Sequence, residues 1–212
     1  MKHRLFWLAL YAVTMAYVES AVVVYLRALY YPDGFAFPLV ALPAGMIAIE
    51  VGREGSTLLM LLAIAALAGR DPWERFLAFN IAFGVWDVFY YVWLWIFLGW
   101  PPSLFTWDLL FLIPVPWLGP VLAPLIVSIA LIVVSLWLWQ LDERGARVRF
   151  STGHWMSAIA GGVIVLVSFM IDFQSAVDLR MPAPFRWDVF SVGVLMALAA
   201  VVHGYRRSLR SS

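Results

Sequence analysis

Charged side chains interrupt stretches of this sequence that are otherwise apolar. The acidic ones are Glu19, Glu50, Glu54 and Asp87, and the basic ones are Arg27 and Arg53. A charge at the centre of a bilayer costs about 2.5–3.5 kcal/mol on insertion scales, so such residues usually mark a path or a binding site. We therefore predict that the four carboxylates bind protons or a cation, and that the two arginines tune their charge.

Helical spacing should bring these groups together. Glu50, Arg53 and Glu54 stand at positions i, i+3 and i+4, so they share one face of a helix. The apolar runs that carry Glu19, Glu50 and Asp87 are consecutive and would be antiparallel. Their polar residues are then expected at similar depths, in one interior site that opens outward.

Polar and aromatic residues near Asp87 are candidates for the lining of this site. They are Asn80, Trp86, Tyr90, Tyr91 and, from the next external segment, Asp108. Aromatic faces can hold a cation or a flat apolar ligand. The alternative is that most of these rings face lipid or the membrane interface.

Four acids against two arginines leave an excess of negative charge that something must neutralise. Protonation, a bound metal ion or organic cation, or an aqueous cavity open to the outside would each do so. As metal ligands, Glu19, Glu50, Glu54 and Asp87 form an oxygen-only set, which suits a divalent metal such as Mg, Ca or Mn. The structural alternative is an ion-pair network in which Arg53 bridges Glu50, Glu54 and Asp87.

Other residue types in the sequence argue against several kinds of cofactor and partner. The chain has no cysteine, which excludes disulfides and cysteine-ligated iron–sulfur clusters. His154 and His203 fall at similar depths near the cytoplasmic ends of two predicted helices, where they could ligate haem or metal. Interfacial histidines explain them more simply, so we expect no haem. The net charge is +1, and no basic face indicates nucleic-acid binding.

Apolar runs long enough to cross a membrane must position these residues. The chain is 64% hydrophobic and 13% charged, against roughly 25% charged in a soluble domain. A span needs about 20 mostly apolar residues. Six runs meet this requirement, at 5–30, 42–68, 76–98, 121–141, 156–173 and 189–204.

The distribution of Lys and Arg predicts the orientation of the six spans, because cytoplasmic loops carry the excess of positive charge. One side collects Lys2, Arg4, Arg70, Arg75, Arg144, Arg147, Arg149, Arg206, Arg207 and Arg210, whereas the other holds Arg180 and Arg186. We expect both termini in the cytoplasm and a single transmembrane domain over residues 1–212. The expected location is the bacterial cytoplasmic (inner) membrane.

The external segment 99–120 is apolar and aromatic and contains five prolines. It is too broken to span the membrane, so we predict an interfacial or re-entrant segment, serving as a lid or as an aromatic collar. Asp108 and Asp188 each precede an apolar run and are predicted to cap helices. The predicted fold is an all-α integral membrane protein, a six-helix transmembrane bundle with this external segment.

The leading functional hypothesis is proton- or cation-coupled transport of a small solute or ion. The first alternative is a metal-dependent membrane enzyme acting on a lipid or isoprenoid substrate, so enzymatic activity stays undecided. The second is a subunit of a membrane complex. Small residues at Ser157 and Gly161, and at Ala158 and Gly162, favour close helix packing within the bundle or between protomers, which leaves a homo-oligomer open.

Overall fold

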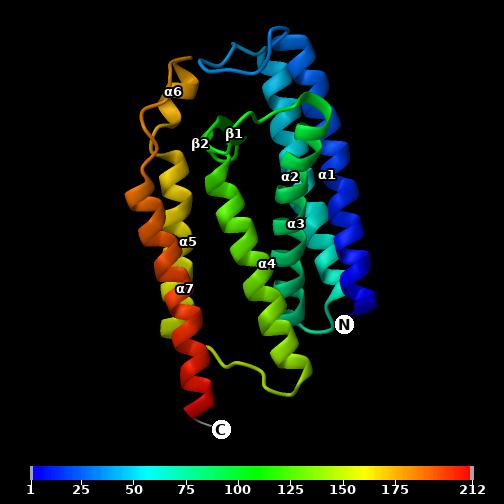
Figure 1. The fold of residues 1–212 in the computed structure, drawn as a ribbon, viewed down its shortest axis with the longest axis vertical. Helices are drawn as coiled ribbons and strands as arrows, with labels where there is room; N and C mark the ends of the chain where they lie inside the picture. The colour runs from blue at the N-terminus through cyan, green and yellow to red at the C-terminus, as the bar shows by residue number, and fades with distance from the viewer. Residues whose placement is uncertain (1, 211–212) are drawn as a thin grey trace.

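The computed structural model describes residues 2–210 and consists mainly of long apolar helices (Figure 1). The helices are α1 (Lys2–Tyr30), α2 (Ala44–Ala68), α3 (Pro72–Leu98), α4 (Leu122–Glu143), α5 (Thr152–Met170), α6 (Phe173–Val177) and α7 (Trp187–Arg210). Two strands, β1 (Trp107–Phe111) and β2 (Trp117–Pro120), form an antiparallel hairpin between α3 and α4. Over the described residues, six helices are long and apolar enough to cross a membrane, with α5 and α6 together forming the fifth. The predicted six-helix bundle is confirmed.

Both chain ends lie at the same end of the bundle, together with the α2–α3 and α4–α5 connections (Figure 1). We call this the cytoplasmic end, because its loops carry the arginines that the positive-inside rule places there. The opposite end, with the α1–α2 and α6–α7 connections, is the outer end. The placement of the cytoplasm itself stays a prediction.

The third helix begins earlier than its apolar run, because a polar motif starts it. The Asp71 carboxylate accepts a hydrogen bond of 2.9 Å from the backbone N–H of Glu74, and Pro72 lies in the first turn. The helix therefore begins at Pro72 and not at residue 76. It ends before Gly99, whose φ of 62° closes the helix in the left-handed conformation that glycine tolerates best.

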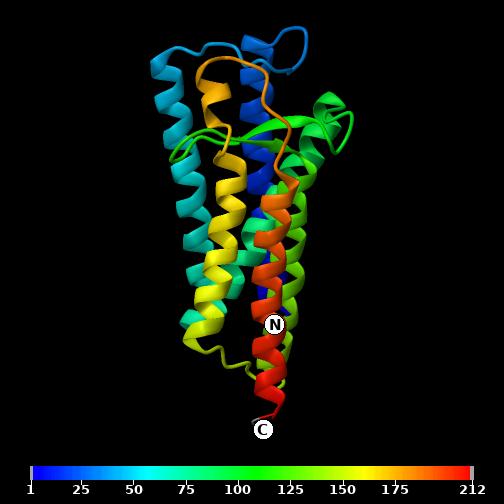
Figure 2. The ribbon, with the colours of Figure 1, turned by 90° about the vertical axis from the view of Figure 1, so that its left-hand side faces the viewer.

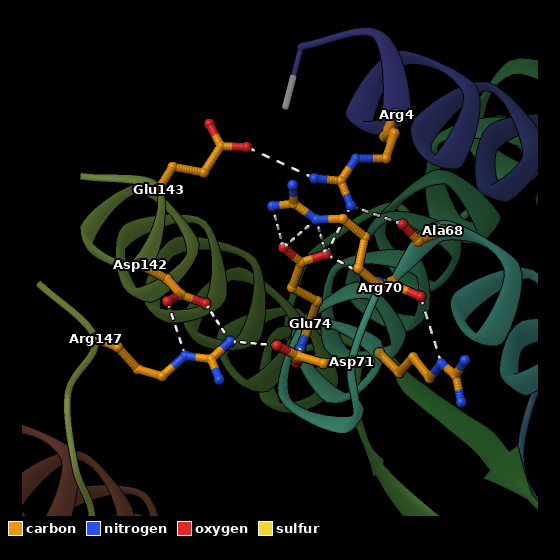
Figure 3. Close-up of polar contacts among 10 residues, drawn as sticks. Arg4, Ala68, Arg70, Asp71, Glu74, Asp142, Glu143 and Arg147 are labelled. Atoms are coloured by element: carbon orange, nitrogen blue, oxygen red, sulfur yellow. Dashed lines mark hydrogen bonds and ion pairs between the residues drawn. The ribbon is translucent and has the colours of Figure 1, made fainter. Parts of the chain in front are cut away.

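A network of ion pairs joins α1, α3 and α4 at the cytoplasmic end (Figure 3). The buried Glu74 carboxylate lies 2.7 Å from the Arg4 guanidinium and 2.6 Å from that of Arg70. Arg4 also lies 3.6 Å from Glu143 at the end of α4. These pairs hold the first turns of α1 and α3 beside the last turn of α4.

Arg147, in the α4–α5 loop, extends this network. It lies 2.5 Å from Asp71 and 2.7 Å from Asp142 (Figure 3). The backbone N–H of Glu74, and then Arg147, lower the pKa of Asp71 below its ordinary value of 3.8. Asp71 is therefore charged at neutral pH, and its ion pair weakens only when the pH falls below that value.

The helices form two groups. In the first, α3 packs against α1, α2 and α4, and in the second α5 packs against α7 (Figure 2). A Cβ atom built on Gly161 would lie 2.7 Å from the carbonyl oxygen of Gly193, and the reverse distance is also 2.7 Å. Glycine at both positions therefore allows the closest approach of α5 and α7. Gly161 thus packs within the bundle.

Aromatic side chains join the two groups near their ends. At the outer end Trp117, in β2, stacks on Phe169 of α5 with ring centroids 6.3 Å apart. At the cytoplasmic end Trp137 of α4 meets Tyr205 of α7 at 4.7 Å. Such pairs add roughly 0.5–1.5 kcal/mol each beyond the area they bury.

The external segment folds back into the bundle as the β1–β2 hairpin. The hairpin crosses the bundle toward α2, below the outer ends of α1 and α2 (Figures 1 and 2). Trp107 pairs with Pro120 and Leu109 with Leu118, with an irregularity before Phe111. Pairing satisfies the backbone polar groups on the facing edges of the two strands, which an unpaired re-entrant chain would leave without partners.

Two predicted helix caps are wrong. Asp108 lies in β1 and caps no helix. Asp188 lies inside the first turn of α7, one residue after its start, and pairs with Arg186 at 2.6 Å. A local pattern of aspartate before an apolar run therefore did not distinguish a cap from a strand residue with a distant partner.

Candidate functional site

Glu19, Glu50 and Arg53 form a buried ion-pair cluster between α1 and α2. The Glu19 Oε1 atom lies 2.5 Å from Arg53 Nη1, and Glu50 Oε2 lies 2.9 Å from Arg53 Nη2. Both glutamates are more than nine-tenths buried. Arg53 thus bridges Glu19 and Glu50. Of the three partners in the network proposed from sequence, Glu50 does pair with Arg53, whereas Glu54 and Asp87 accept hydrogen bonds from other groups.

Neutral donors complete the hydrogen bonding of Glu19. Its Oε2 atom accepts hydrogen bonds from Thr57 Oγ1 at 2.8 Å and from Trp86 Nε1 at 3.2 Å. With Arg53 on the other oxygen, Glu19 connects α1 to α2 and α3. A buried carboxylate with this many partners is held in one geometry.

Glu54 lies one helical turn from Glu50 but binds a different part of the protein. Its Oε2 atom accepts a hydrogen bond of 2.8 Å from the backbone N–H of Leu112, in the loop of the hairpin. This N–H belongs to a turn at membrane depth and would otherwise lack water as a partner. Glu54 therefore fastens the tip of the hairpin to α2.

Asp108 fastens the base of the same hairpin. Its carboxylate lies 3.3 Å from Arg27 of α1 and accepts a hydrogen bond of 3.2 Å from the hydroxyl of Tyr91. The Arg27 guanidinium lies 3.8 Å from the Trp100 ring centroid and 4.2 Å from that of Phe35, in the range of cation–π contact.

Asp87 faces α4, away from the ion-pair cluster. Its Oδ2 atom accepts a hydrogen bond of 2.7 Å from Ser128 Oγ. One turn earlier, a Cβ atom on Gly84 would lie 2.6 Å from the carbonyl oxygen of Ser128, so only glycine permits this approach of α3 to α4. The glycine thus brings Ser128 within reach of Asp87.

Asp87 and Ser128 line a cavity of about 590 Å³ between the two helix groups. Its walls come from α3, α4, α5 and α7. The hairpin side chains Leu110, Phe111 and Trp117 line its outer part, and Trp73 and Phe150 line its cytoplasmic part. This volume is in the usual range for small-molecule sites.

The lining of the cavity is almost entirely apolar. Aromatic rings and small residues make up much of it, and the polar lining groups are Asn80, Asp87, Ser128, Ser135 and His154. Within the part of the chain that the structure describes, Asp87 supplies the one carboxyl of this lining. An apolar molecule with few polar groups matches these walls.

The cavity opens toward lipid between α3 and α5. Phe76 on α3 and Ile159 and Leu166 on α5 all line it, and these side chains are 42%, 60% and 39% exposed. Gly162, on the same helix, also lines it, and a Cβ atom there would meet nothing within 4 Å. A molecule dissolved in the bilayer can therefore reach the cavity from the side.

The structure separates the residues that sequence analysis grouped together. Asn80, Trp86 and Asp87 line the cavity, whereas Tyr91 and Asp108 bind each other near Arg27, and Tyr90 lies outside the cavity lining. Sequence analysis predicted neither the cavity nor three residues of its lining, Ser128, Ser135 and Trp117. Gly84, a glycine in the middle of an apolar helix, was the one local signal of a close helix approach there.

The four carboxylates do not converge on one point. Among residues 2–210, no group of three or more His, Asp or Glu side chains is placed to hold a metal ion. Glu19 and Glu50 share Arg53, Glu54 binds the hairpin, and Asp87 binds Ser128. The donor set expected for a divalent metal is therefore not assembled in this arrangement.

The fold defines a polytopic α-helical membrane protein, with a lipid-facing cavity between two helix groups. No protein-family model matches the chain, and no curated protein or solved structure matches it either.

Replacing Glu19 by alanine should destabilise the protein strongly. The change leaves half-buried Arg53 with one carboxylate instead of two, and Thr57 and Trp86 lose their acceptor. Removal of one partner from a fully buried pair costs roughly 3–5 kcal/mol, which is the upper bound here. Unfolding in mixed detergent and SDS micelles measures this loss. The matched control is Arg186→Ala, which breaks the exposed pair with Asp188 and should change little. Equal stability of the two variants would show that the Glu19 cluster does not hold α1 to α2.

Proposed function

We propose that this protein binds an isoprenoid or other lipid-like molecule in the cavity between the α3–α4 and α5–α7 faces. The observation that carries the proposal is the cavity itself: about 590 Å³, apolar, roofed by the hairpin and open to lipid. The surrounding lipid is as apolar as the cavity, so a lipid tail can move from one to the other at little cost in solvation free energy. The shape of the cavity and its few polar groups then determine which molecule binds.

The buried polar contacts outside the cavity support this proposal, because they explain what holds the hairpin over the cavity. Glu54 holds the hairpin tip through Leu112, and Asp108 holds its base through Arg27 and Tyr91. These contacts hold Phe111 and Trp117 in the cavity lining through groups of the protein itself. The roof is thus built by the protein, and binding need not order it.

Asp87 is the reactive group of the proposed site. Ser128 fixes one carboxylate oxygen, and the side chain contributes to the cavity wall. If the bound molecule reacts, Asp87 is the residue placed to donate or accept a proton at its oxygen. The proposal thus includes lipid chemistry that depends on proton transfer by a carboxyl.

Filling the cavity should abolish binding. Gly162→Phe projects a ring into the cavity without clashing with the backbone, because the position is open. Gly52→Phe is the matched control, since Gly52 is an exposed α2 glycine that is equally open and does not line the cavity. Mass spectrometry of molecules retained after detergent exchange should find one apolar species at near-stoichiometric amount in the wild type and Gly52→Phe, and at least tenfold less in Gly162→Phe. Equal retention by both variants would refute the proposal.

Proton-coupled transport of a small solute or ion is the second candidate. Glu54 and Asp87 accept hydrogen bonds from neutral donors, and in the described part of the chain neither lies within ion-pair distance of a basic side chain. Intramembrane carboxyls without a fixed cation are typical proton carriers. Glu54 lies outside the cavity lining, so its placement favours transport independently of the cavity.

A proton-flux measurement tests this candidate. Proteoliposomes carrying a pH-sensitive dye and an imposed pH gradient should lose the gradient faster than empty liposomes. Asp87→Asn and Glu54→Gln should each slow the loss at least tenfold, and Asp188→Asn, at an exposed position, should leave it unchanged. Leakage no faster than that of empty liposomes would remove the candidate.

A further inference from the structure

Polar side chains line the cavity between the two helix groups at two levels. Asp87 of α3 and Ser128 of α4 form the outer level, joined by their hydrogen bond of 2.7 Å. Seven residues closer to the cytoplasmic end on each of these antiparallel helices are Asn80 and Ser135, which also line the cavity. Seven residues are close to two helical turns, so the two levels lie on the same helix faces, about 10.5 Å apart.

The polar groups of α3 at these two levels are available to a bound molecule. Ser128 binds Oδ2 of Asp87, and among residues 2–210 no hydrogen bond involves the other carboxylate oxygen or the Asn80 amide. Neither group is sealed by packing, since the sealed side-chain atoms without a partner in the described chain are on Arg27 and four tryptophans. The free amide has both a donor and an acceptor to offer to a ligand.

The spacing of these two groups limits the size of what they can hold together. Side chains of one helix lean in the same direction, so the polar atoms of Asn80 and Asp87 are also about 10.5 Å apart. Two hydrogen bonds of about 2.9 Å along this line leave roughly 5 Å between the two polar atoms of the ligand. Two oxygens on opposite sides of a six-membered ring have this separation.

Aromatic side chains form the α3 wall between the two levels. Phe83 lies between Asn80 and Asp87 along the helix and lines the cavity, and its ring centroid is 5.4 Å from that of Trp86, which lines the cavity too. A flat ring held by both polar groups would contact these aromatic side chains, and aromatic rings pack favourably against one another.

Gly162 of α5 leaves room opposite this wall. Phe76 of α3 and Trp155 of α5 meet with ring centroids 5.5 Å apart, and both helices run outward from the cytoplasmic end (Figure 1). At about 1.5 Å per residue from that contact, Asn80 lies about 6 Å, Gly162 about 10.5 Å and Asp87 about 16.5 Å further out. The glycine, where a Cβ atom would meet nothing within 4 Å, is therefore level with the interval between the two polar groups.

We infer that the ligand of this cavity is a quinone or its quinol, with one ring oxygen at Asn80 and the other at Asp87. Amide and carboxyl groups can each donate or accept a hydrogen bond, so the site suits both redox forms. The isoprenoid tail leaves through the lipid-facing opening between α3 and α5, past Phe76 and Ile159. This inference rests on the proposed lipid-binding function and names its ligand class.

A matched pair of ligands tests the inference on the full-length protein. One is a menaquinone with a geranylgeranyl tail, measured both as the quinone and as the quinol. The other is a methylnaphthalene with the same tail and no ring oxygens. Native mass spectrometry should show that the wild type binds at least one redox form at least tenfold more tightly than the oxygen-free analogue.

Substitutions of the two polar groups should remove this preference. Asn80→Leu and Asp87→Leu should each reduce it several-fold and leave binding of the analogue unchanged, which also shows that these variants are folded. Asp87→Asn should keep most of the preference, because a carboxamide can still donate or accept a hydrogen bond. Gln140→Leu, which removes an exposed α4 amide outside the cavity lining, is the control and should keep the full preference.

The outcomes separate the inference from the function on which it rests. Equal binding of quinone, quinol and analogue by the wild type, or a preference that survives both leucine substitutions, would overturn the quinone site and leave the apolar cavity as the binding site. If none of the three binds the wild type, the inference fails. The retention measurement on Gly162→Phe then decides the proposed function separately.

Discussion

A bilayer core contains no water to satisfy polar groups, and the rest of this structure depends on that constraint. The chain places a β-hairpin and several charged residues at membrane depth, so each needs a partner within the protein. Glu54 accepts the N–H of Leu112 in the hairpin loop, and Arg27 pairs with Asp108 at the hairpin base. These contacts allow a non-helical segment to stay inside the bundle.

The hairpin and the glycines together explain why a cavity exists. Gly84 draws α4 onto α3, and Gly161 with Gly193 draws α7 onto α5, so each pair packs tightly within itself. Aromatic contacts then join the pairs near their ends, while the space between them stays open over the middle of the bundle. A close-packed interior would have closed this space, so its persistence needs a rigid frame on both sides.

The polar cluster that stands out in the sequence has two physical roles in the structure. The first role is structural, because the ion pairs of Arg53 with Glu19 and Glu50 hold α1 against α2. Apolar residues can often replace such a network as a whole without loss of stability. Asp87 is different because it lies on the cavity wall, where its partner is a hydroxyl and not a cation. The functional proposals therefore rest on Asp87 and the cavity more than on the cluster.

The six spans were predictable because hydropathy is a local property of the sequence, and each helix needs only its own apolar run. The arrangement of the acids was not, since it depends on the direction of each side chain around its helix. Trp86 points to Glu19, and Asp87, about 100° further round α3, points to Ser128. The role of Asp108 depended on Arg27, which is 81 residues away in the chain, so no local pattern could assign it.

An experimental structure of the protein in lipid nanodiscs tests the central claim most directly. The account predicts an elongated density between α3–α4 and α5–α7, beneath Phe111 and Trp117, with Asp87 and Ser128 beside it. Direct packing of α5 and α7 against α3 and α4, with no space between the two groups, would contradict it.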